Sequence, residues 1–288
     1  MNLSQPVVTA IGSCRVFGPL RKMHDRGEIY LNKAGIYGFV HYPKEIIQMI
    51  KVLQGDVRIP RELRPFTMAE DPFLGNSINK IMRMSDKAQK GLKATDIFVI
   101  EIGSLKEIKF LHYYLQLNHT YNFFSRFKFR DYWWDNLFKG SWDQGEIRQT
   151  FGTAIDSKLT PLQKEIVLRS RGTIPGKSSV IHDMELIKQL VRKPIIFVTH
   201  IDLLNQEFEE LGEREKLAEY VAEGARLLDE HVFRPGKLIS QFGQQKAMQA
   251  KGRDLYHYTD EFEWIVGEHI VNIYIFGQIK DRYTNTQG

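Results

Sequence analysis

The sequence predicts an α/β fold, a three-layer sandwich in which helices cover both faces of a mostly parallel β-sheet. Apolar runs of strand length alternate with helical patterns along most of the 288 residues. Two runs, at 97–100 and just after Lys193, are continuous and rich in residues that favour strands. Strands buried on both faces of a parallel sheet have this composition. Apolar residues form 42% of the chain, enough for a substantial core.

The first predicted strand spans residues 6–12 and ends in a Gly-Ser turn that leads into a helix. A second strand falls within 28–35, and the segment 42–54 has apolar residues at helical spacing. The carboxyl ends of parallel strands lie at one edge of the sheet, where α/β proteins bind their ligands. We therefore expect the turn at 12–14 to lie at the functional edge.

The alternation continues through the second half of the chain. Strands are predicted within 94–104 and 193–202, with a short last strand at 237–242. Helices are predicted at 178–193, at 213–232 and within 254–276. The stretch at about 107–180 is rich in aromatic residues and does not fit one strand-helix unit. We interpret the chain as a single domain, 1–288, with a largely helical, aromatic-rich insertion at about 107–180.

Composition and charge restrict the partners. The net charge of +5 and an isoelectric point near 9.1 suit anionic ligands, although an ordinary basic surface explains them equally well. No run of about five Lys or Arg residues occurs, so no nucleic-acid-binding arm is predicted. No apolar run approaches about 18 residues and the N-terminus lacks a signal-peptide pattern, which predicts a cytoplasmic protein without a membrane span. Cys14 is the single cysteine, so no internal disulfide can form.

Ser13 and an Asp-x-x-His segment are the strongest candidates for chemistry. A serine hydroxyl is a weak nucleophile that needs a base within hydrogen-bonding reach, and the base needs an orienting group. Ser13 lies at the first strand-to-helix turn, where backbone N–H groups and the helix N-terminus can stabilise an oxyanion. Asp254 precedes His257 by three residues, which allows the carboxylate to orient the imidazole. We predict Ser13, Asp254 and His257 as a catalytic triad.

The sequence resembles the SGNH/GDSL hydrolase superfamily at four segments, which occur in the family's order: IGSCRVFGPL, IFVIEIGSLKE, IIFVTHID and DLYHYTDEF. The Gly-Ser-Cys turn is similar to the GSCFA-like and capsule polysaccharide-associated branches of that superfamily. The resemblance implies a flavodoxin-like sheet. It also implies that Ser13 is the nucleophile, His257 the general base and Asp254 the group that orients it.

The resemblance implies two further donors to the oxyanion hole. A glycine N–H of the family's second block corresponds best to Gly35, with Gly38 as the next candidate. The third block carries an Asn in a Gly-x-Asn pattern, whereas this chain has Gly-Ser-Leu there. Ser104, or Asn32 from the neighbouring loop, is the candidate for this donor.

Four residues are candidates for substrate binding: His200, Trp133, Trp134 and Arg15. His200 follows a buried strand at the same sheet edge, a position that also suits a structural histidine. Glu101, one strand over, is either part of the site or a buried, paired carboxylate. The adjacent tryptophans cannot share one face of a regular element, so one of them is expected to be exposed. Most other aromatic residues in this stretch are expected to form its core.

The sequence thus predicts a serine esterase or O-acyltransferase, of acetyl-ester type, that acts on a carbohydrate or polysaccharide. No metal is predicted, because none of the nine histidines has the spacing of metal ligands. No resident cofactor is predicted, and acyl-CoA is the expected donor if the enzyme is a transferase. The missing Asn of the third block favours an alternative, a non-catalytic glycan-binding or polysaccharide-assembly module on the same fold.

A third hypothesis is a cysteine-dependent enzyme that uses Cys14. This thiol shares the helix N-terminus with Ser13, which would lower the thiol pKa. A packed, inert cysteine is the commoner outcome for a single buried thiol.

Overall fold

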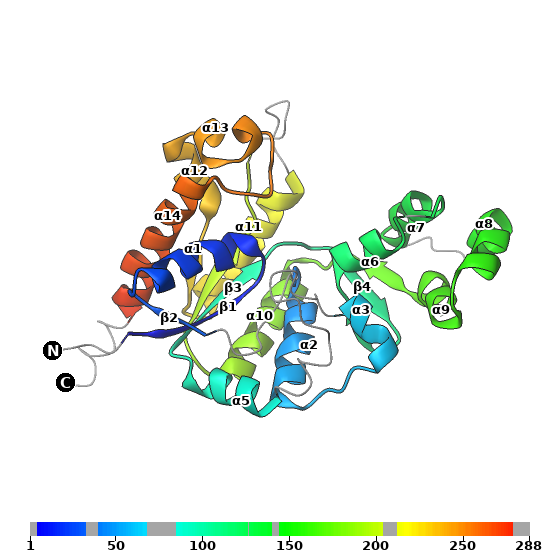
Figure 1. The fold of residues 1–288 in the computed structure, drawn as a ribbon, viewed down its shortest axis with the longest axis horizontal. Helices are drawn as coiled ribbons and strands as arrows, with labels where there is room; N and C mark the ends of the chain where they lie inside the picture. Colours follow the sequence, from blue (N-terminus) through cyan, green and yellow to red (C-terminus); the bar gives the residue numbers. More distant parts are fainter. Residues whose placement is uncertain are drawn as a thin grey trace.

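The computed structural model of the chain describes residues 5–32, 40–67, 85–125, 127–139, 144–203 and 212–278. Its main sheet is parallel, with the strand order β2-β1-β3-β7-β8 and helices on both faces (Figure 1). The strands are β1 (Val7–Ile11), β2 (Tyr30–Leu31), β3 (Ile97–Ile102), β7 (Ile195–Thr199) and β8 (His231–Phe233). The structure therefore confirms the predicted α/β fold, with a flavodoxin-like strand order.

Alternate residues of each strand point to opposite faces of this sheet. Val99 of β3 lies in the core beneath one helical layer, and Ile100 lies in the core beneath the other. The first layer contains α1 (Cys14–Asp25), α12 (Pro235–Phe242) and α14 (Asp260–His269). The second contains α2 (Pro43–Gln54), α10 (Lys177–Val191) and α11 (Gly212–Leu227). Burial on both sides explains why the strands are almost wholly apolar.

Four shorter segments complete the described part of this body: α5 (Ser85–Ala94), α13 (Gln244–Ala247), a 3₁₀ turn (Ala250–Gly252) and a π-helical turn (Ile270–Ile275). The segments η1 (Arg61–Leu63) and α3 (Arg64–Thr67) instead pack against the second sheet described below. Within the described ranges, we find no helix that combines the length and the apolar character needed to cross a membrane.

The predicted last strand at 237–242 is wrong, because these residues belong to helix α12. Pro235 occupies the first turn of this helix, where its fixed φ suits helical geometry. Ile239 is buried, and Leu238 and Phe242 pack beside it with the spacing of one helical face. The last strand of the sheet is β8, which lies at the end of the segment that was predicted to be helical.

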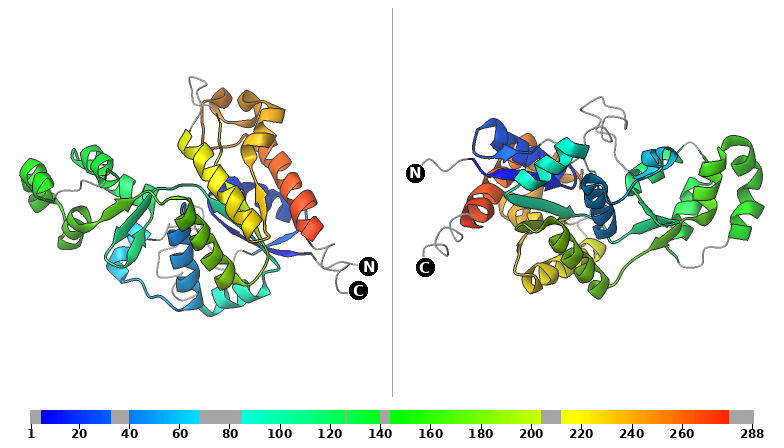
Figure 2. Two further views of the ribbon diagram at one scale, coloured as in Figure 1. Left: turned by 180° about the vertical axis from the view of Figure 1, so that it is seen from behind. Right: turned by 90° about the horizontal axis from the view of Figure 1, so that it is seen from below.

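A second, antiparallel sheet lies in the segment between β3 and α10. Its strand order is β5-β4-β6, formed by β4 (Glu107–Phe110), β5 (Tyr113–Leu115) and β6 (Arg171–Thr173). Beyond it lie α6 (Leu117–Phe123), α7 (Arg130–Leu137), α8 (Gln144–Lys158) and α9 (Pro161–Arg169) (Figures 1 and 2). This segment is largely helical, as predicted, and contains a small sheet that was not predicted.

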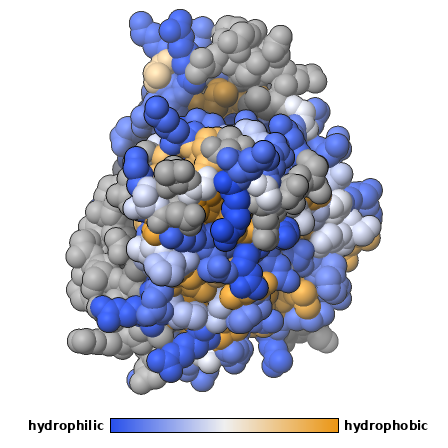
Figure 3. Space-filling view, turned by 90° about the vertical axis from the view of Figure 1, so that its right-hand side faces the viewer, coloured by the Kyte–Doolittle hydropathy of each residue, from blue (hydrophilic) through white to orange (hydrophobic). Residues whose placement is uncertain are grey.

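The aromatic residues of this segment form a core of their own, which includes Phe110, Phe124, Phe127, Phe129 and Trp133. Tyr42, at the start of α2, joins this core to the main body. Its hydroxyl lies 2.6 Å from the Leu115 carbonyl oxygen and 3.1 Å from that of Ile108. At the outer end of the segment, hydrophilic residues cover most of the surface and hydrophobic ones show in small patches (Figure 3). The aromatic residues therefore act mainly in packing.

Gly12 allows the end of β1 to lie against β3. The two strands pair in parallel from Val8 opposite Ile97 to Ile11 opposite Ile100. The next residue, Gly12, has a φ of +147°, and a Cβ at this position would lie 2.5 Å from the Glu101 Cβ. A side chain is therefore excluded both by the backbone conformation and by the close approach of β3.

We expect Gly12→Ala to lower the free energy of unfolding by about 2–4 kcal/mol, because it adds backbone strain and a steric clash. Urea denaturation measures this loss. Gly152→Ala is the matched control, since Gly152 lies in α8 with no atom within 4 Å of an added Cβ. That change should raise stability by about 0.5–1 kcal/mol. Equal effects of the two substitutions would contradict this account of Gly12.

Candidate active site

Ser13 is the N-cap residue of α1, two positions beyond the last residue of β1. Its hydroxyl accepts a hydrogen bond from the Arg15 backbone N–H at 3.3 Å. Its carbonyl oxygen accepts from the N–H groups of Val16 and Phe17, both at 3.1 Å. Serine is favoured at this position because its side chain satisfies an N–H group that has no partner within the helix. Ser13 therefore lies at the carboxyl edge of the main sheet, at the positive end of α1.

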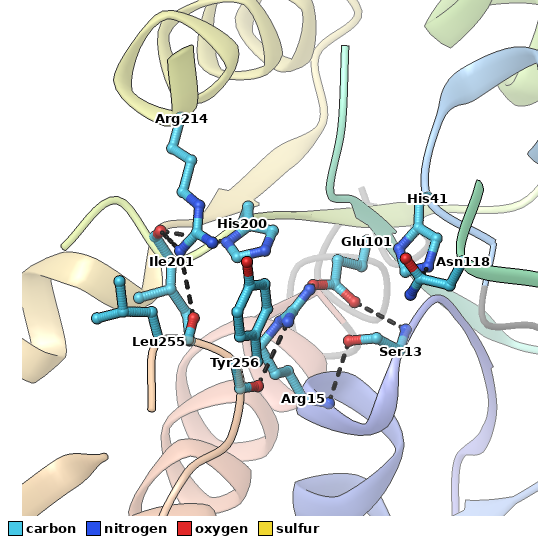
Figure 4. A network of polar contacts seen from close by, with 10 residues as sticks. All are labelled: Ser13, Arg15, His41, Glu101, Asn118, His200, Ile201, Arg214, Leu255 and Tyr256. Atoms are coloured by element: carbon cyan, nitrogen blue, oxygen red, sulfur yellow. Dashed lines mark hydrogen bonds and ion pairs between the residues drawn. The ribbon is translucent and has the colours of Figure 1, made fainter. Parts of the chain in front are cut away.

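Glu101 is a buried carboxylate of β3 that holds this turn in place (Figure 4). It accepts the Ser13 N–H at 2.7 Å and two N–H groups of the Arg15 guanidinium, Nε at 2.8 Å and Nη2 at 2.6 Å. Burial alone would raise the pKa of Glu101. The Arg15 charge and the hydrogen bonds from Ser13 instead hold that pKa below its ordinary value of 4.5. Glu101 is therefore an ionised carboxylate with three donors.

Asp254 and His257 form a hydrogen-bonded pair in the loop before α14. Asp254 Oδ2 lies 2.8 Å from His257 Nδ1, and Oδ1 accepts the backbone N–H groups of Tyr256 and His257 at 2.8 and 3.1 Å. Burial opposes ionisation, but the hydrogen bonds from His257 and Tyr256 lower the pKa of Asp254. The carboxylate thus orients the imidazole through Nδ1 and leaves Nε2 to accept a proton.

Arg15 connects this pair to the turn that contains Ser13. Its Nη1 donates a hydrogen bond to the Tyr256 carbonyl oxygen at 3.3 Å. In the described part of the chain no hydrogen bond joins Ser13 to His257. Ser13 is 5% exposed, whereas the His257 side chain is 54% exposed. The structure therefore brings the two segments together and contains the Asp254–His257 hydrogen bond, but Ser13 and His257, the predicted nucleophile and base, are not hydrogen-bonded to each other.

Two histidines, the buried His200 and the partly buried His41, flank Glu101 (Figure 4). His200 follows β7, with Nδ1 3.2 Å from the Ile201 carbonyl oxygen and its ring edge-on to Tyr256. His41 precedes α2, and its Nε2 accepts a hydrogen bond from the Asn118 amide at 3.0 Å. Burial lowers the pKa of His41 to about 4 and lowers that of His200 as well. Both rings are therefore neutral at pH 7, and His200 lies at the predicted sheet edge.

The structure describes two of the three predicted oxyanion donors, Ser104 and Asn32. Gly35 lies outside the described residues. The Ser104 hydroxyl accepts a backbone N–H at 2.9 Å, and the Ser104 N–H donates to the His41 carbonyl oxygen at 2.8 Å. The Asn32 amide donates to Thr9 Oγ1 at 3.1 Å, in the middle of β1. The Asn32 amide is thus engaged with a buried side chain of β1.

Trp133 is fully buried, and its indole N–H donates to the Val167 carbonyl oxygen at 3.0 Å. This ring therefore belongs to the core of the insertion and not to its surface. Trp134 is partly exposed and packs edge-on against Tyr121 and Phe138. Helix α7, which carries both rings, lies across the antiparallel sheet from α1 (Figure 1). The structure does not bring Trp134 to the triad residues.

Cys14 has the opposite electrostatic environment from the one predicted. Burial is the largest cause that raises its pKa, and the charges of Glu101 and Glu263 add to it, while Arg15 lowers it. The predicted lowering of the thiol pKa is therefore wrong. A protonated thiol is a poor nucleophile, which weakens the hypothesis of a cysteine-dependent enzyme.

Two further residues lie at the candidate site, Arg214 and Tyr256, and neither was predicted from the sequence. Arg214, in the first turn of α11, donates from Nη1 to the carbonyl oxygens of Ile201 and Leu255, both at 3.2 Å. Its guanidinium carbon lies 5.0 Å from the centre of the Tyr256 ring. Only the position of Tyr256 inside the Asp-x-x-His segment could have drawn attention to it. Among the described residues, no group of three or more His, Cys, Asp or Glu side chains could hold a metal ion.

Comparison with known proteins places the chain in a family. The model of the TviD N-terminal domain family matches residues 6–273, so the chain belongs to this family. The Vi polysaccharide biosynthesis protein TviD of Salmonella typhi is 27% identical over 264 residues, which are 88% of this chain. The chain spans only 30% of the length of that relative.

Among solved structures, a candidate arylesterase from Agrobacterium tumefaciens is 11% identical to the chain. The match covers 96% of this chain and 99% of that one, with a TM-score of 0.31. A score this low carries no argument about function.

We expect Glu101→Gln to destabilise the protein by about 3–5 kcal/mol, because the substitution leaves the buried Arg15 charge without its partner. Glu165→Gln is the control, since Glu165 pairs with Arg169 on the surface and the change should cost less than about 1 kcal/mol. Because the folded-state pKa of Glu101 lies below 4.5, its contribution is present above pH 4.5 and is lost as the pH falls through the folded value. Urea denaturation at several pH values should show a shallower acid loss in Glu101→Gln. An unchanged acid loss would count against the ion pair.

The His41 ring should titrate with a midpoint near pH 4, measured from its Cε1–H resonance by NMR. The unfolded chain binds this proton near the ordinary pKa of 6.5, so stability should fall as the pH drops from 6.5 to 4. His41→Gln should lose that part of the pH dependence. A His41 midpoint near 6.5 would contradict the burial of this ring.

Proposed function

We propose that this member of the TviD N-terminal domain family is a serine esterase or O-acyltransferase that acts on acyl esters of a carbohydrate. The observation that carries the proposal is the Asp254–His257 pair, held by Arg15 beside the turn that contains Ser13. The name of the Salmonella typhi relative supports polysaccharide biosynthesis as the setting. The bond from Arg15 to the Tyr256 carbonyl oxygen, which joins the turn and the Asp-x-x-His segment, supports a Ser-His-Asp mechanism.

In the first half-reaction the Ser13 hydroxyl attacks the carbonyl carbon of an acyl ester or thioester. Its proton passes to His257 Nε2, and the ionised Asp254 carboxylate stabilises the resulting imidazolium. The tetrahedral intermediate then expels the alcohol or thiol, which takes the proton back from His257. The product of this half-reaction is an acyl-serine.

In the second half-reaction water or a sugar hydroxyl attacks the acyl-serine, again with His257 as the base. Water gives hydrolysis, and a sugar hydroxyl gives transfer of the acyl group. Acyl-CoA is the donor that we propose for the transfer reaction. Both outcomes use the same residues of this chain.

The oxyanion needs donors other than the Ser13 N–H, because that group is bonded to Glu101. A carboxylate beside the oxyanion would oppose its formation. In the first turn of α1 the N–H groups of Arg15, Val16 and Phe17 are bonded to Ser13, which leaves the Cys14 N–H and the positive end of this helix as donors at this turn. Substrate must also bring Ser13 and His257 together, as often happens when catalytic hydrogen bonds tighten on binding.

A second candidate function is a non-catalytic glycan-binding or polysaccharide-assembly module. The low exposure of Ser13 and the Ser13–Glu101 hydrogen bond favour it, since both withdraw the serine from substrate. The exposed His257 would then contact the ligand without activating a nucleophile. Turnover separates this candidate from the esterase.

We expect the chain to hydrolyse p-nitrophenyl acetate with a kcat/KM that falls about 1,000-fold or more in Ser13→Ala and His257→Ala. Asp254→Asn should lower it about 100-fold or more, since the ring loses its orienting carboxylate. Cys14→Ala is the control and should keep its activity. If wild type and Ser13→Ala turn over the ester equally, or if Cys14→Ala alone is inactive, the serine mechanism fails.

A further inference from the structure

Arg214 is a partly buried arginine at the candidate active site with no carboxylate within salt-bridge distance among the described residues. Its two hydrogen bonds to carbonyl oxygens both use Nη1. A guanidinium carries five N–H donors in a planar fork, so the carbonyls engage one corner of it. The Tyr256 side chain also hydrogen-bonds this guanidinium, and the donors that remain can pair with the oxygens of an anion.

Among the described residues, the carboxylates of this site already have partners. Glu101 is paired with Arg15 at 2.6 Å, and Asp254 is paired with His257 at 2.8 Å. The buried His200 ring between these groups is neutral at pH 7, because burial lowers its pKa. Burial and the charge of Arg15 lower the pKa of Arg214, although the interaction with Tyr256 raises it in part. A bound anion would therefore stabilise this guanidinium.

Tyr256 provides a ring surface beside this charge. It is 55% exposed, although its ring lies edge-on to His200 and 5.0 Å from the Arg214 guanidinium carbon. Figure 4 shows Arg214 extending from α11 toward His200 and the Tyr256 ring. Exposed aromatic rings with one face supported by the protein are suited to contact sugar rings. Tyr256 also directly precedes His257 in the chain, so this ring belongs to the same loop as the proposed base.

We propose that Arg214 and Tyr256 form an anion-binding subsite beside His257, which takes a carboxylate or phosphate group attached to a sugar ring. Arg214 pairs with the anion and Tyr256 contacts the ring that carries it. The assignment deepens the proposed function and rests on it for the statement that this ligand is the substrate. Binding itself does not depend on turnover.

The test measures dissociation constants by ligand-observed NMR for methyl β-glucuronoside, glucose 1-phosphate and the uncharged methyl β-glucoside. None of the three is an acyl ester, so the result is independent of esterase activity. Wild type should bind at least one of the anionic sugars about 10-fold or more tighter than the neutral glucoside. Preference for the glucuronoside identifies a carboxylate site, and preference for the phosphate identifies a phosphate site.

Arg214→Gln should weaken binding of the preferred anionic sugar about 10- to 100-fold and abolish the preference. Arg214→Lys should retain part of the preference for the anionic sugar, since the positive charge remains but the planar guanidinium is lost. This variant replaces Arg214→Gln in the test if Arg214→Gln does not fold. Arg226→Gln removes the same charge from an exposed position of α11 and should keep the full preference. Absence of any preference in wild type, or full preference in Arg214→Gln, would overturn the proposal.

Discussion

The buried ion pair between Glu101 and Arg15 is the interaction on which the candidate site depends. It joins β3 to the first turn of α1, and Arg15 extends the connection to the Tyr256 carbonyl oxygen at 3.3 Å. A carboxylate in the interior needs a charged partner and full hydrogen bonding, and Glu101 has both. The glycine before Ser13 lets this carboxylate approach the turn. One residue of β3 thus positions the serine, the arginine and, through the arginine, the Asp-x-x-His segment.

The same interaction sets the chemistry that Ser13 can perform. By accepting the Ser13 N–H, Glu101 fixes the cap of α1 and also withdraws one donor from an oxyanion. By ordering Arg15, it fixes the backbone of the loop whose next residue is His257. The Asp254–His257 pair is formed and accessible, while the serine is not yet bonded to it. In the mechanism that we propose, a substrate bound at Tyr256 and Arg214 brings His257 and Ser13 into contact.

Local sequence patterns predicted the parallel sheet, the turn at Ser13 and the Asp254–His257 pair. The apolar runs and the residues that follow them indicate the strands and the turn, and the spacing of three residues indicates the pair. The strand order of the antiparallel sheet and the burial of Trp133 depend on contacts between distant segments, which no local pattern contains. The Cys14 pKa was predicted from the helix dipole alone, and burial outweighs that dipole. Arg214 lies in an Ala- and Glu-rich helix whose pattern indicates only a solvated face, so its place at the site follows from the tertiary fold.

The most direct test of the acyl-serine mechanism is to label the protein with a fluorophosphonate and map the adduct by mass spectrometry. The account predicts one adduct on Ser13 in the wild type and none in His257→Ala, because the hydroxyl reacts only when the imidazole removes its proton. No adduct in a folded wild-type protein, or an adduct at another residue, would contradict the account and favour the glycan-binding module.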